Sequence, residues 1–433
     1  MVKAEESLTR RLVSTGLSRI GLLPVSVGAT LLAQGLAIDA VGVTQFGVIS
    51  LVTTMPQLLT FLDFGIGTAL INGFARGDRP SARRQTRVAL AILGIVAFLV
   101  LLTGVALQLT VGWRKLLGSD IFLYGYWPPL LFLLMFACSI PFGLGARILT
   151  GLGRVALATI LQTIFPLMNL ACAIAGYFGS QPGLFIIGPA CAQLAVAILT
   201  FVVATRIAGF KGNTSLSPTF GTAADRLGIF QTAWPMLITM MGVPVALQSH
   251  RIALSHMASA EALGVYAVAM VFYAPAMSLV NQVLSNLWPH FAGIASKQGE
   301  FVANTHFWSI FRKSAFMLVL YAAVFFVLAP VGVQVLSEVS VPRHLWAAMA
   351  VLILIQGLQA VPGMYLTDAR GLRFQAVSVS LMCLTALALM LVLTPMMGAV
   401  GPVLSSVLAV ILAQLIPELL LLGPFMRWKR ARQ

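Results

Sequence analysis

Ionisable side chains are scarce in the long apolar segments of this chain, so each of them is a candidate for chemistry. The notable positions are Arg19, Asp63, His250, Arg251 and Glu418. A charge at the centre of a bilayer costs about 2.5–3.5 kcal/mol on insertion scales, so it needs a partner, water or a proton. Asp63 is the most informative, because Arg76 lies 13 residues away in sequence, or roughly 20 Å along a helix. The Asp63 carboxylate should therefore be paired, hydrated or protonated.

The other four positions each have a functional or a structural interpretation. Arg19 lies about 10 Å into its apolar segment, from which it could reach a polar cavity or extend to the inner membrane surface. Arg251 stands at the end of its segment and could line the cavity or reach the outer interface. His250 could titrate near neutral pH or hold helices together. Glu418 is expected to pair with Arg427, about 13 Å away along a helix.

Polar side chains recur on one face of four apolar segments, because a helix turns by about 100° per residue. The residues on these faces are Thr15, Arg19, Ser26, Thr30 and Gln34; Ser50, Thr53, Gln57 and Thr60; Thr232, Thr239 and His250; and Ser278, Asn281, Gln282 and Ser285. Any single serine or threonine could join two helices through a hydrogen bond worth about 0.6 kcal/mol. Four such faces, on the first, second, seventh and eighth segments, favour a shared water-filled cavity instead.

Twelve apolar segments must position these side chains. Of the 433 residues, 59% are hydrophobic and 9% are charged, with a mean hydropathy of +0.96, and a membrane-spanning helix needs roughly 20 apolar residues. The segments are 12–34, 46–72, 88–111, 124–146, 155–178, 184–205, 229–250, 264–288, 314–336, 345–366, 375–397 and 399–422. With the N-terminus inside, 23 of the 27 lysines and arginines fall on the inner side, which predicts that both termini are cytoplasmic.

The two halves of the chain echo one another. Each half carries a basic loop, a helix and then a Gly-Pro pair in the next helix. The loops are 149–154 (LTGLGR) and 366–373 (LTDARGLR), and the pairs are Gly188-Pro189 and Gly401-Pro402. A fainter echo joins 45–48 (QFGV) and 265–268 (VYAV). These matches indicate an internal repeat.

Six segments in each half mean that both halves start on the same side of the membrane, as in a parallel repeat. We therefore predict an all-α polytopic membrane protein with twelve transmembrane helices in two six-helix lobes. A parallel pseudo-two-fold relates the lobes, which enclose a central cavity. The N-terminal lobe is 1–208, the cytoplasmic linker 209–228, and the C-terminal lobe, with its basic cytoplasmic tail, 229–433.

Composition, absent sequence motifs and short loops disfavour several other function classes. The net charge of +15 follows the membrane sidedness and does not indicate nucleic acid. No P-loop, HExxH, GxSxG or CxxC pattern occurs, so we expect no direct ATP-driven step, no metal and no cofactor. The four cysteines are expected to be small buried hydrophobes. Outer loops of only about 5 to 12 residues count against an enzyme and favour a transporter.

Several stretches, which together span most of the chain, carry a family resemblance. Phe46-Gly47, followed by 62–67 (LDFGIG) and a basic loop, resembles the helix 1–2 region of the polysaccharide exporters, the Wzx-like flippases of lipid-linked oligosaccharides. Residues 250–292 resemble the helix 7–8 region of the same family, and 365–375 (YLTDARGLRFQ) and the Gly-Pro pair near the start of the last helix are also similar. The family belongs to the multidrug, oligosaccharidyl-lipid and polysaccharide exporter superfamily.

This resemblance implies a cavity gated by helices 1, 2, 7 and 8, and the flipping of an undecaprenyl-diphosphate-linked glycan from the inner to the outer leaflet. A cationic lumen suits a diphosphate, because arginine contacts phosphate oxygens in bidentate fashion. We expect the following residues to bind the substrate: Arg19, Gln57, His250, Arg251 and Asn281. Ser249-His250-Arg251 stands where the family leads us to expect an aspartate, which leaves Asp63 as the ion-coupling candidate.

We therefore predict a flippase of O-antigen or another surface polysaccharide repeat unit, acting by alternating access in the bacterial cytoplasmic membrane and driven by an ion gradient. Membrane lipids, a polysaccharide polymerase and chain-length machinery are the expected partners. Three alternatives stay open. A drug antiporter of the same superfamily would want carboxylates in the lumen, a lipid-II-type flippase usually has more arginines there, and a membrane glycan ligase would need larger outer loops.

Overall fold

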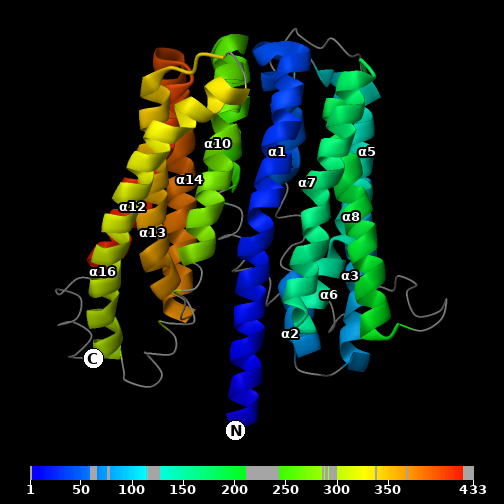
Figure 1. Cartoon of the computed structure of the whole chain (residues 1–433), viewed down its shortest axis with the longest axis vertical. Coiled ribbons are helices and arrows are strands. Elements are labelled where there is room, and N and C mark those ends of the chain that lie inside the picture. The colour runs from blue at the N-terminus through cyan, green and yellow to red at the C-terminus, as the bar shows by residue number, and fades with distance from the viewer. Residues whose placement is uncertain are drawn as a thin grey trace. The chain divides into compact units, whose positions relative to one another are not determined.

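The computed structural model describes residues 2–58, 66–75, 79–113, 115, 127–210, 242, 244–284, 287, 291, 300–336, 339–366 and 369–422. For 2–23, 55–58, 300–305 and a few single positions it describes the backbone alone. The labelled elements of this described part are all helices (Figure 1). The predicted all-α class is therefore confirmed.

The helices follow one another as long, mostly apolar rods. Their bounds are α1 (Val2–Leu58), α2 (Ile66–Ala75), α3 (Arg79–Thr110), α5 (Trp127–Phe142), α6 (Leu144–Gly151), α7 (Val155–Phe178), α8 (Leu184–Ala208), α10 (Ala260–Leu284), α12 (Glu300–Leu336), α13 (Arg343–Tyr365), α14 (Ala369–Met397), α15 (Val400–Val410), the π-helical turn η3 (Ile411–Leu415) and α16 (Ile416–Leu422). Residues 244–257 are also helical. Within the described ranges, ten helices are long and apolar enough to cross a membrane, so the chain is a multi-pass membrane protein.

Helix α1 differs from the prediction between residues 35 and 45. We expected a loop at 35–45 between the first two segments, yet the chain is helical on both sides of a single break at Gly42, where φ is 77° and ψ is 164°. Glycine populates positive φ readily because it has no Cβ, so one residue suffices to break the helix. Asp39 made this region look like a loop, but its carboxylate accepts a hydrogen bond from the Tyr177 hydroxyl at 2.7 Å.

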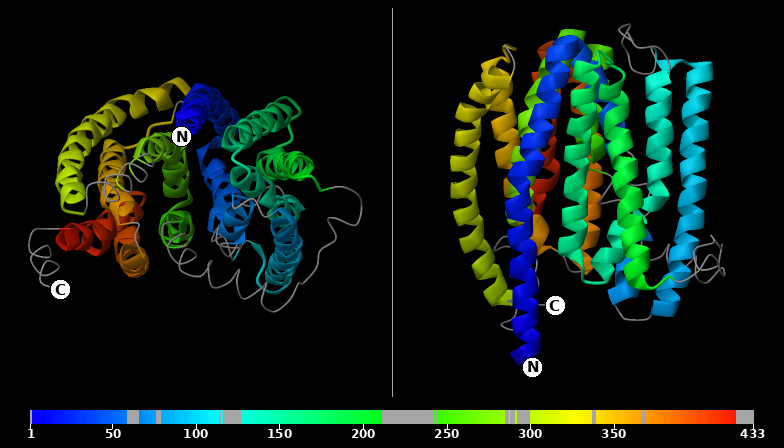
Figure 2. Two further views of the ribbon diagram at one scale, coloured as in Figure 1. Left: turned by 90° about the horizontal axis from the view of Figure 1, so that it is seen from below. Right: turned by 45° about the vertical axis from the view of Figure 1, so that its right-hand side comes forward.

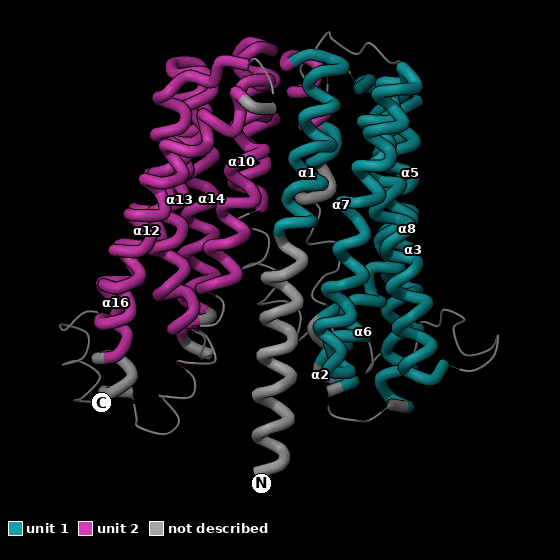
Figure 3. The backbone as a smooth tube through the Cα atoms, in the orientation of Figure 1, with its two compact units in different colours: residues 1–42, 52–116, 120–237 teal, residues 43–51, 117–119, 238–433 magenta. Residues whose placement is uncertain are grey.

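The chain forms two compact units (Figure 3). Unit 1 comprises residues 1–42, 52–116 and 120–237, and unit 2 comprises 43–51, 117–119 and 238–433. Helix α1 therefore contributes to both units, since the nine residues after Gly42 pack within unit 2. The predicted lobe boundary lies at 209–228, of which residues 211–228 are outside the described part.

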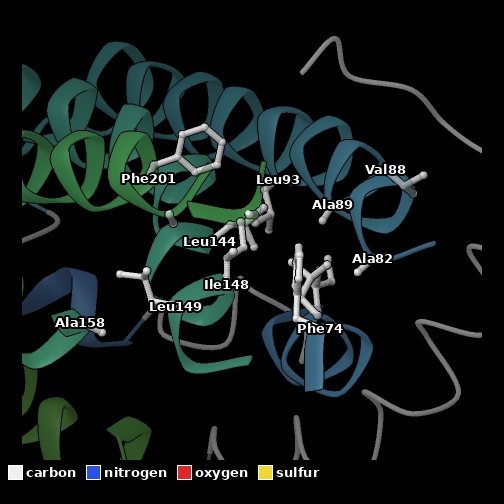
Figure 4. Close-up of a cluster of buried hydrophobic side chains, with 14 residues drawn as sticks. Phe74, Ala82, Val88, Ala89, Leu93, Leu144, Ile148, Leu149, Ala158 and Phe201 are labelled. Carbon is white, nitrogen blue, oxygen red and sulfur yellow. The ribbon is translucent and has the colours of Figure 1, made fainter. Parts of the chain in front are cut away.

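The core of unit 1 forms where α2, α3, α6, α7 and α8 meet (Figure 4). Leu70, Phe74 and Ile148 are among its buried side chains. Gly151 shows how close the packing is, because a Cβ there would lie 2.8 Å from the Phe74 Cβ. The motif 149–154 is thus a tight helix contact followed by a turn, which Gly153 completes at φ 72°.

An arginine of α3 caps one helix of unit 1. Both Nε and Nη2 of Arg83 donate to the Ala208 carbonyl, at 3.2 and 2.7 Å, where α8 ends. The last carbonyls of a helix have no partner in the helix itself, and a cation there also opposes the negative end of the dipole. Gly209 follows at φ 75° and ends the helix. Arg83, predicted only as a topology signal, therefore also has a structural contact.

Unit 2 is built from segment 43–51, the helix 244–257, α10 and α12 to α16. Helix α12 is long and curved when seen along the bundle (Figure 2). A small apolar cluster packs the helix 244–257, α14, α15 and η3 together, and Ala246, Met382 and Ala413 belong to it. Many large apolar side chains of α12 and α14 are exposed, as expected for surfaces that face lipid.

In the last span, Val400–Leu422, one helical hydrogen bond is missing and a neighbouring helix replaces it. Pro417 has no backbone N–H, so the carbonyl of Ala413, four residues earlier, loses its usual helical donor. The Ser378 hydroxyl of α14 donates to that carbonyl at 2.6 Å. A backbone group freed inside a membrane helix must be satisfied by a neighbour. The π-helical turn η3 immediately precedes Pro417, so the helix departs from regular geometry just before Glu418.

Candidate functional site

The helix 244–257 carries two ionisable side chains that are buried in unit 2. His250 is 1% exposed and Arg251 is 5% exposed. Neighbouring residues on a helix point about 100° apart, so both can be buried only because packed elements surround this helix on more than one side. Those elements are segment 43–51, α10 and α15, as the contacts below show.

His250 joins three helices. One ring nitrogen, Nδ1, lies 2.8 Å from the Tyr266 hydroxyl of α10, and the other, Nε2, lies 2.7 Å from the Ser406 hydroxyl of α15. Both hydroxyls can donate or accept, so either tautomer of the neutral ring is satisfied. His250 thus has no open ring nitrogen, which is the geometry of the helix-joining alternative; its role in substrate binding stays a prediction.

Arg251 is a buried cation without an acidic partner among the described residues. Its Nε donates to the Ser50 hydroxyl at 3.1 Å, and its Nη1 donates to the Gln248 side-chain carbonyl at 2.8 Å. The guanidinium carbon lies 5.8 Å from the centre of the Tyr266 ring, within cation–π distance. A guanidinium has five N–H donors, and these contacts use donors on Nε and Nη1.

A close contact between the two echoing segments brings Ser50 to Arg251. A Cβ on Gly47 would lie 2.8 Å from the Gly264 nitrogen, and a Cβ on Gly264 would lie 2.5 Å from the Val43 carbonyl oxygen. Only two glycines allow backbones to approach so closely. The sequence had paired 45–48 with 265–268 as repeats, and the structure packs these regions against one another within unit 2.

Helix α10 presents a polar face of a different kind. Ser278 and Asn281 are exposed, and Gln282, which is half-buried, donates to the Ser278 hydroxyl at 3.5 Å. The opposite side of the same helix is buried and carries Tyr266 and Tyr273. Exposed amide and hydroxyl groups are costly in hydrocarbon and cheap in water, so this face favours a hydrated environment. The substrate-binding role of Asn281 and the cavity-lining role of Ser278 stay predictions.

Of the α1 residues predicted to form the polar faces, Ser26, Thr30, Gln34 and Thr53 belong to unit 1, and Ser50 belongs to unit 2. Thr30 donates to the Ser26 carbonyl of its own helix at 2.8 Å, which uses its only hydroxyl donor. Gln34 is half-buried, and its Oε1 atom is buried without a hydrogen-bond partner in the described residues. Thr53 is half-buried. That these four side chains line a common cavity stays a prediction.

The remaining predicted residues cannot be placed, because their side chains lie outside the described part of the structure. They are Thr15, Arg19, Gln57, Thr60, Asp63, Thr232, Thr239 and Ser285. Their assignments as substrate ligands, cavity residues or ion-coupling group stay predictions. No group of three or more His, Cys, Asp or Glu in the described residues could hold a metal ion.

Glu418 has a partner that the sequence did not suggest. The side-chain N–H₂ of Gln359 in α13 lies 3.3 Å from each carboxylate oxygen. Glu418 is 0% exposed and is the only acidic residue that is buried among those described. Arg427, its expected partner, lies outside the described residues. Residue spacing alone also could not predict the contacts of Tyr266 and Ser406 with His250.

Comparisons with known proteins place the fold. No protein-family model matches the chain, and no curated protein matches it. A multidrug resistance MATE family transporter of the MOP superfamily, solved in an inward-facing conformation, is 11% identical, with a TM-score of 0.70 over 94% of this chain and 98% of that one.

Two further solved structures share the fold. The lipid II flippase MurJ, in an inward closed conformation, is 13% identical, with a TM-score of 0.72 over 95% of this chain and 87% of that one. A MOP superfamily transporter from Pyrococcus furiosus is 14% identical, with a TM-score of 0.59 over 98% and 96% of the two chains. The chain therefore has the fold of MOP superfamily transporters, as expected from the superfamily resemblance.

Proposed function

We propose that this protein is a flippase that moves an undecaprenyl-diphosphate-linked glycan, the repeat unit of a surface polysaccharide, across the bacterial cytoplasmic membrane by alternating access. Both termini are then cytoplasmic. A polysaccharide polymerase and its chain-length machinery would consume the product. Three features support this function: the fold, the Wzx-like sequence features and the burial of the Arg251 guanidinium.

The single observation that carries the proposal is the buried guanidinium of Arg251. An uncompensated buried charge costs several kcal/mol, and its described contacts are two neutral oxygens and one aromatic ring. A diphosphate supplies the missing negative charge and several strong acceptor oxygens. The two neutral contacts also hold the guanidinium in one orientation, so little side-chain freedom is lost when an anion binds.

The exposed polar face of α10 supports the same function. Ser278 and Asn281 offer hydroxyl and amide groups of the kind that bind sugar hydroxyls. A glycan headgroup needs such neutral donors and acceptors as well as a cation for its diphosphate. The polyprenyl tail needs only apolar surface, and exposed apolar side chains cover α12 and α14.

A cation-coupled drug antiporter of the same fold is the main alternative. A cationic drug would be attracted by carboxylates and repelled by a buried arginine. Glu418 is the one buried acid of the described residues, and it is fully enclosed. The observed charge of unit 2 therefore favours an anionic substrate over a cationic one. A lipid-II-type flippase would share this preference and would differ in its glycan.

The test uses purified protein in liposomes with a fluorescent undecaprenyl-diphosphate disaccharide, and follows its movement between leaflets. Charge-assisted hydrogen bonds are worth about 1.5–3 kcal/mol, so Arg251→Gln should weaken substrate affinity by about 10- to 150-fold. Arg251→Lys should retain part of the activity, because it keeps the charge without the planar fork. Arg312→Gln, at an exposed arginine of the same unit, is the matched control and should behave as wild type.

Two outcomes would contradict the proposal. One is flipping by Arg251→Gln at the wild-type rate with the wild-type substrate dependence. The other is a wild-type protein that leaves the lipid in place but exports a cationic dye in the same liposomes. Elution as a single species in detergent must show that each variant is folded, so that loss of activity is not loss of structure.

A further inference from the structure

Glu418 is unusual because it is a fully buried carboxyl group in a membrane-spanning helix with one neutral partner. It is 0% exposed, and Gln359 is its hydrogen-bond partner among the described residues. Holding an ionised carboxylate in such a place, without a cation, costs several kcal/mol. Ionisable residues inside membrane proteins mark ion or proton pathways more often than packing roles.

The contact with Gln359 has the length expected for a weak hydrogen bond. One N–H₂ group lies 3.3 Å from both carboxyl oxygens. A charge-assisted N–H···O bond is usually about 2.7–2.9 Å long. The longer distances indicate that Gln359 does not form a strong charge-assisted hydrogen bond with an ionised carboxylate. They also leave room for a proton on either carboxyl oxygen.

The charged groups on the packed elements do not reach Glu418. Helix α13 carries Arg343 and His344, but these stand at its first turn, about 24 Å by helical rise from Gln359. On α14, Arg373 is exposed and Cys383 is half-buried, whereas the hydrogen-bond partner of Glu418 among the described residues is Gln359. Neither α15 nor η3 has an ionisable side chain. In the described part of the chain, no cation therefore compensates the carboxyl.

The backbone just before Glu418 departs from regular α-helical geometry. The π-helical turn Ile411–Leu415 and Pro417 immediately precede it, and π-helical turns occur frequently at functional sites. Gln414, one turn earlier on the same face of the helix, is also buried. The Ser378 contact keeps the break satisfied, so the break can persist without destabilising the span.

From these observations we infer that Glu418 is a proton-binding site inside unit 2, and that its protonation and deprotonation are coupled to substrate export. An O–H bond forms at a carboxyl oxygen when hydronium transfers a proton to the carboxylate and leaves a water molecule, and the same bond breaks when the proton returns to water as hydronium. Gln359 donates to the carboxyl and orients it. The coupling half of this inference rests on the proposed function; the proton site does not.

The proton site is tested without any substrate. Infrared difference spectra of the full chain in lipid nanodiscs, recorded between acidic and alkaline buffers, should contain the band of a protonated carboxylic acid. Glu418→Gln should lose that band, and Glu261→Gln, at an exposed glutamate of the same unit, should keep it. An unchanged band in Glu418→Gln overturns the site. So does a Glu418 that stays ionised throughout, as it would in an ion pair with Arg427.

The coupling is tested in liposomes that carry the fluorescent undecaprenyl-diphosphate disaccharide and a proton gradient. For one coupled proton, a pH difference equivalent to about 100 mV, set without a membrane potential, should change the steady-state distribution of the lipid by about 50-fold. Glu418→Gln should move the lipid without responding to the gradient, whereas Glu261→Gln should respond as wild type does. A full response in Glu418→Gln overturns the coupling. A wild-type protein that shows the infrared band but moves no lipid refutes the proposed function and leaves the proton site standing.

Discussion

The break in the last span allows a direct test of how a membrane helix tolerates proline. The Ala413 carbonyl has lost the N–H of residue 417, and the Ser378 hydroxyl, itself 5% exposed, donates to it at 2.6 Å. Ser378→Ala should leave this buried carbonyl without that donor. An unsatisfied buried acceptor costs about 1–3 kcal/mol, and measured hydrogen bonds inside membranes reach about 1.7 kcal/mol. We expect a loss of about 1–2 kcal/mol in the free energy of unfolding.

The second substitution is Pro417→Ala, which restores a backbone N–H opposite the Ala413 carbonyl. In that background the serine is no longer the main donor, so Ser378→Ala should cost about 1 kcal/mol less than it does in the wild type. The measurement is a double-mutant cycle of unfolding free energies in mixed micelles. The cycle isolates this pair from any effect that either substitution has alone.

A matched control exists on the same helix. Ser380 is exposed and donates to the Ala376 carbonyl of α14 itself at 2.8 Å, so Ser380→Ala should cost little and should not couple to Pro417→Ala. The reasoning is refuted if Ser378→Ala costs the same in both backgrounds, within the roughly 0.3–0.5 kcal/mol by which independent sites normally add. Stronger coupling at Ser380 than at Ser378 would refute it equally.

Two further substitutions test the packing of the units. Gly264→Val should prevent correct folding, because its Cβ would lie 2.5 Å from the Val43 carbonyl oxygen and a backbone atom cannot move aside at low cost. Gly28→Ala should be tolerated, because nothing lies within 4 Å of its Cβ. The fraction of monodisperse protein in detergent measures both effects. Arg83→Lys should lower the free energy of unfolding by about 1 kcal/mol, because lysine cannot make both contacts to the Ala208 carbonyl; an unchanged value would show that the helix cap contributes nothing.

The spans were predictable because the bilayer imposes a simple demand. A run of roughly 20 apolar residues flanked by charge rarely forms anything but a membrane-spanning helix, and the predicted segment 155–178 coincides with α7 (Val155–Phe178). The break at Gly42 was not predictable in the same way. Asp39 gave the surrounding residues the polarity of a loop, and its contact with Tyr177 comes from a residue far away in the sequence.

The sequence could predict which polar residues share a helix face, but not whether that face meets another helix or water. Helical spacing grouped His250 with one set and Asn281 with another, and both sets suggested a cavity. The structure buries His250 between two hydroxyls and leaves Asn281 exposed. A polar stripe looks the same in sequence whether it meets another helix or water, because the deciding residues, such as Ser406, belong to distant segments.

Among the described residues of unit 2, Arg251 and Glu418 are buried and charged, and both lack a partner of opposite charge there. A purely structural ion pair would bring opposite charges together, since removing either partner then costs about 3–5 kcal/mol. In the described residues, Arg251 contacts neutral oxygens and a ring, and Glu418 contacts an amide. Each contact orients its charged group without neutralising it. A permanent structural role would be better served by an apolar residue of similar volume, so the retention of both charges favours partners that come and go: an anionic headgroup at Arg251 and a proton at Glu418.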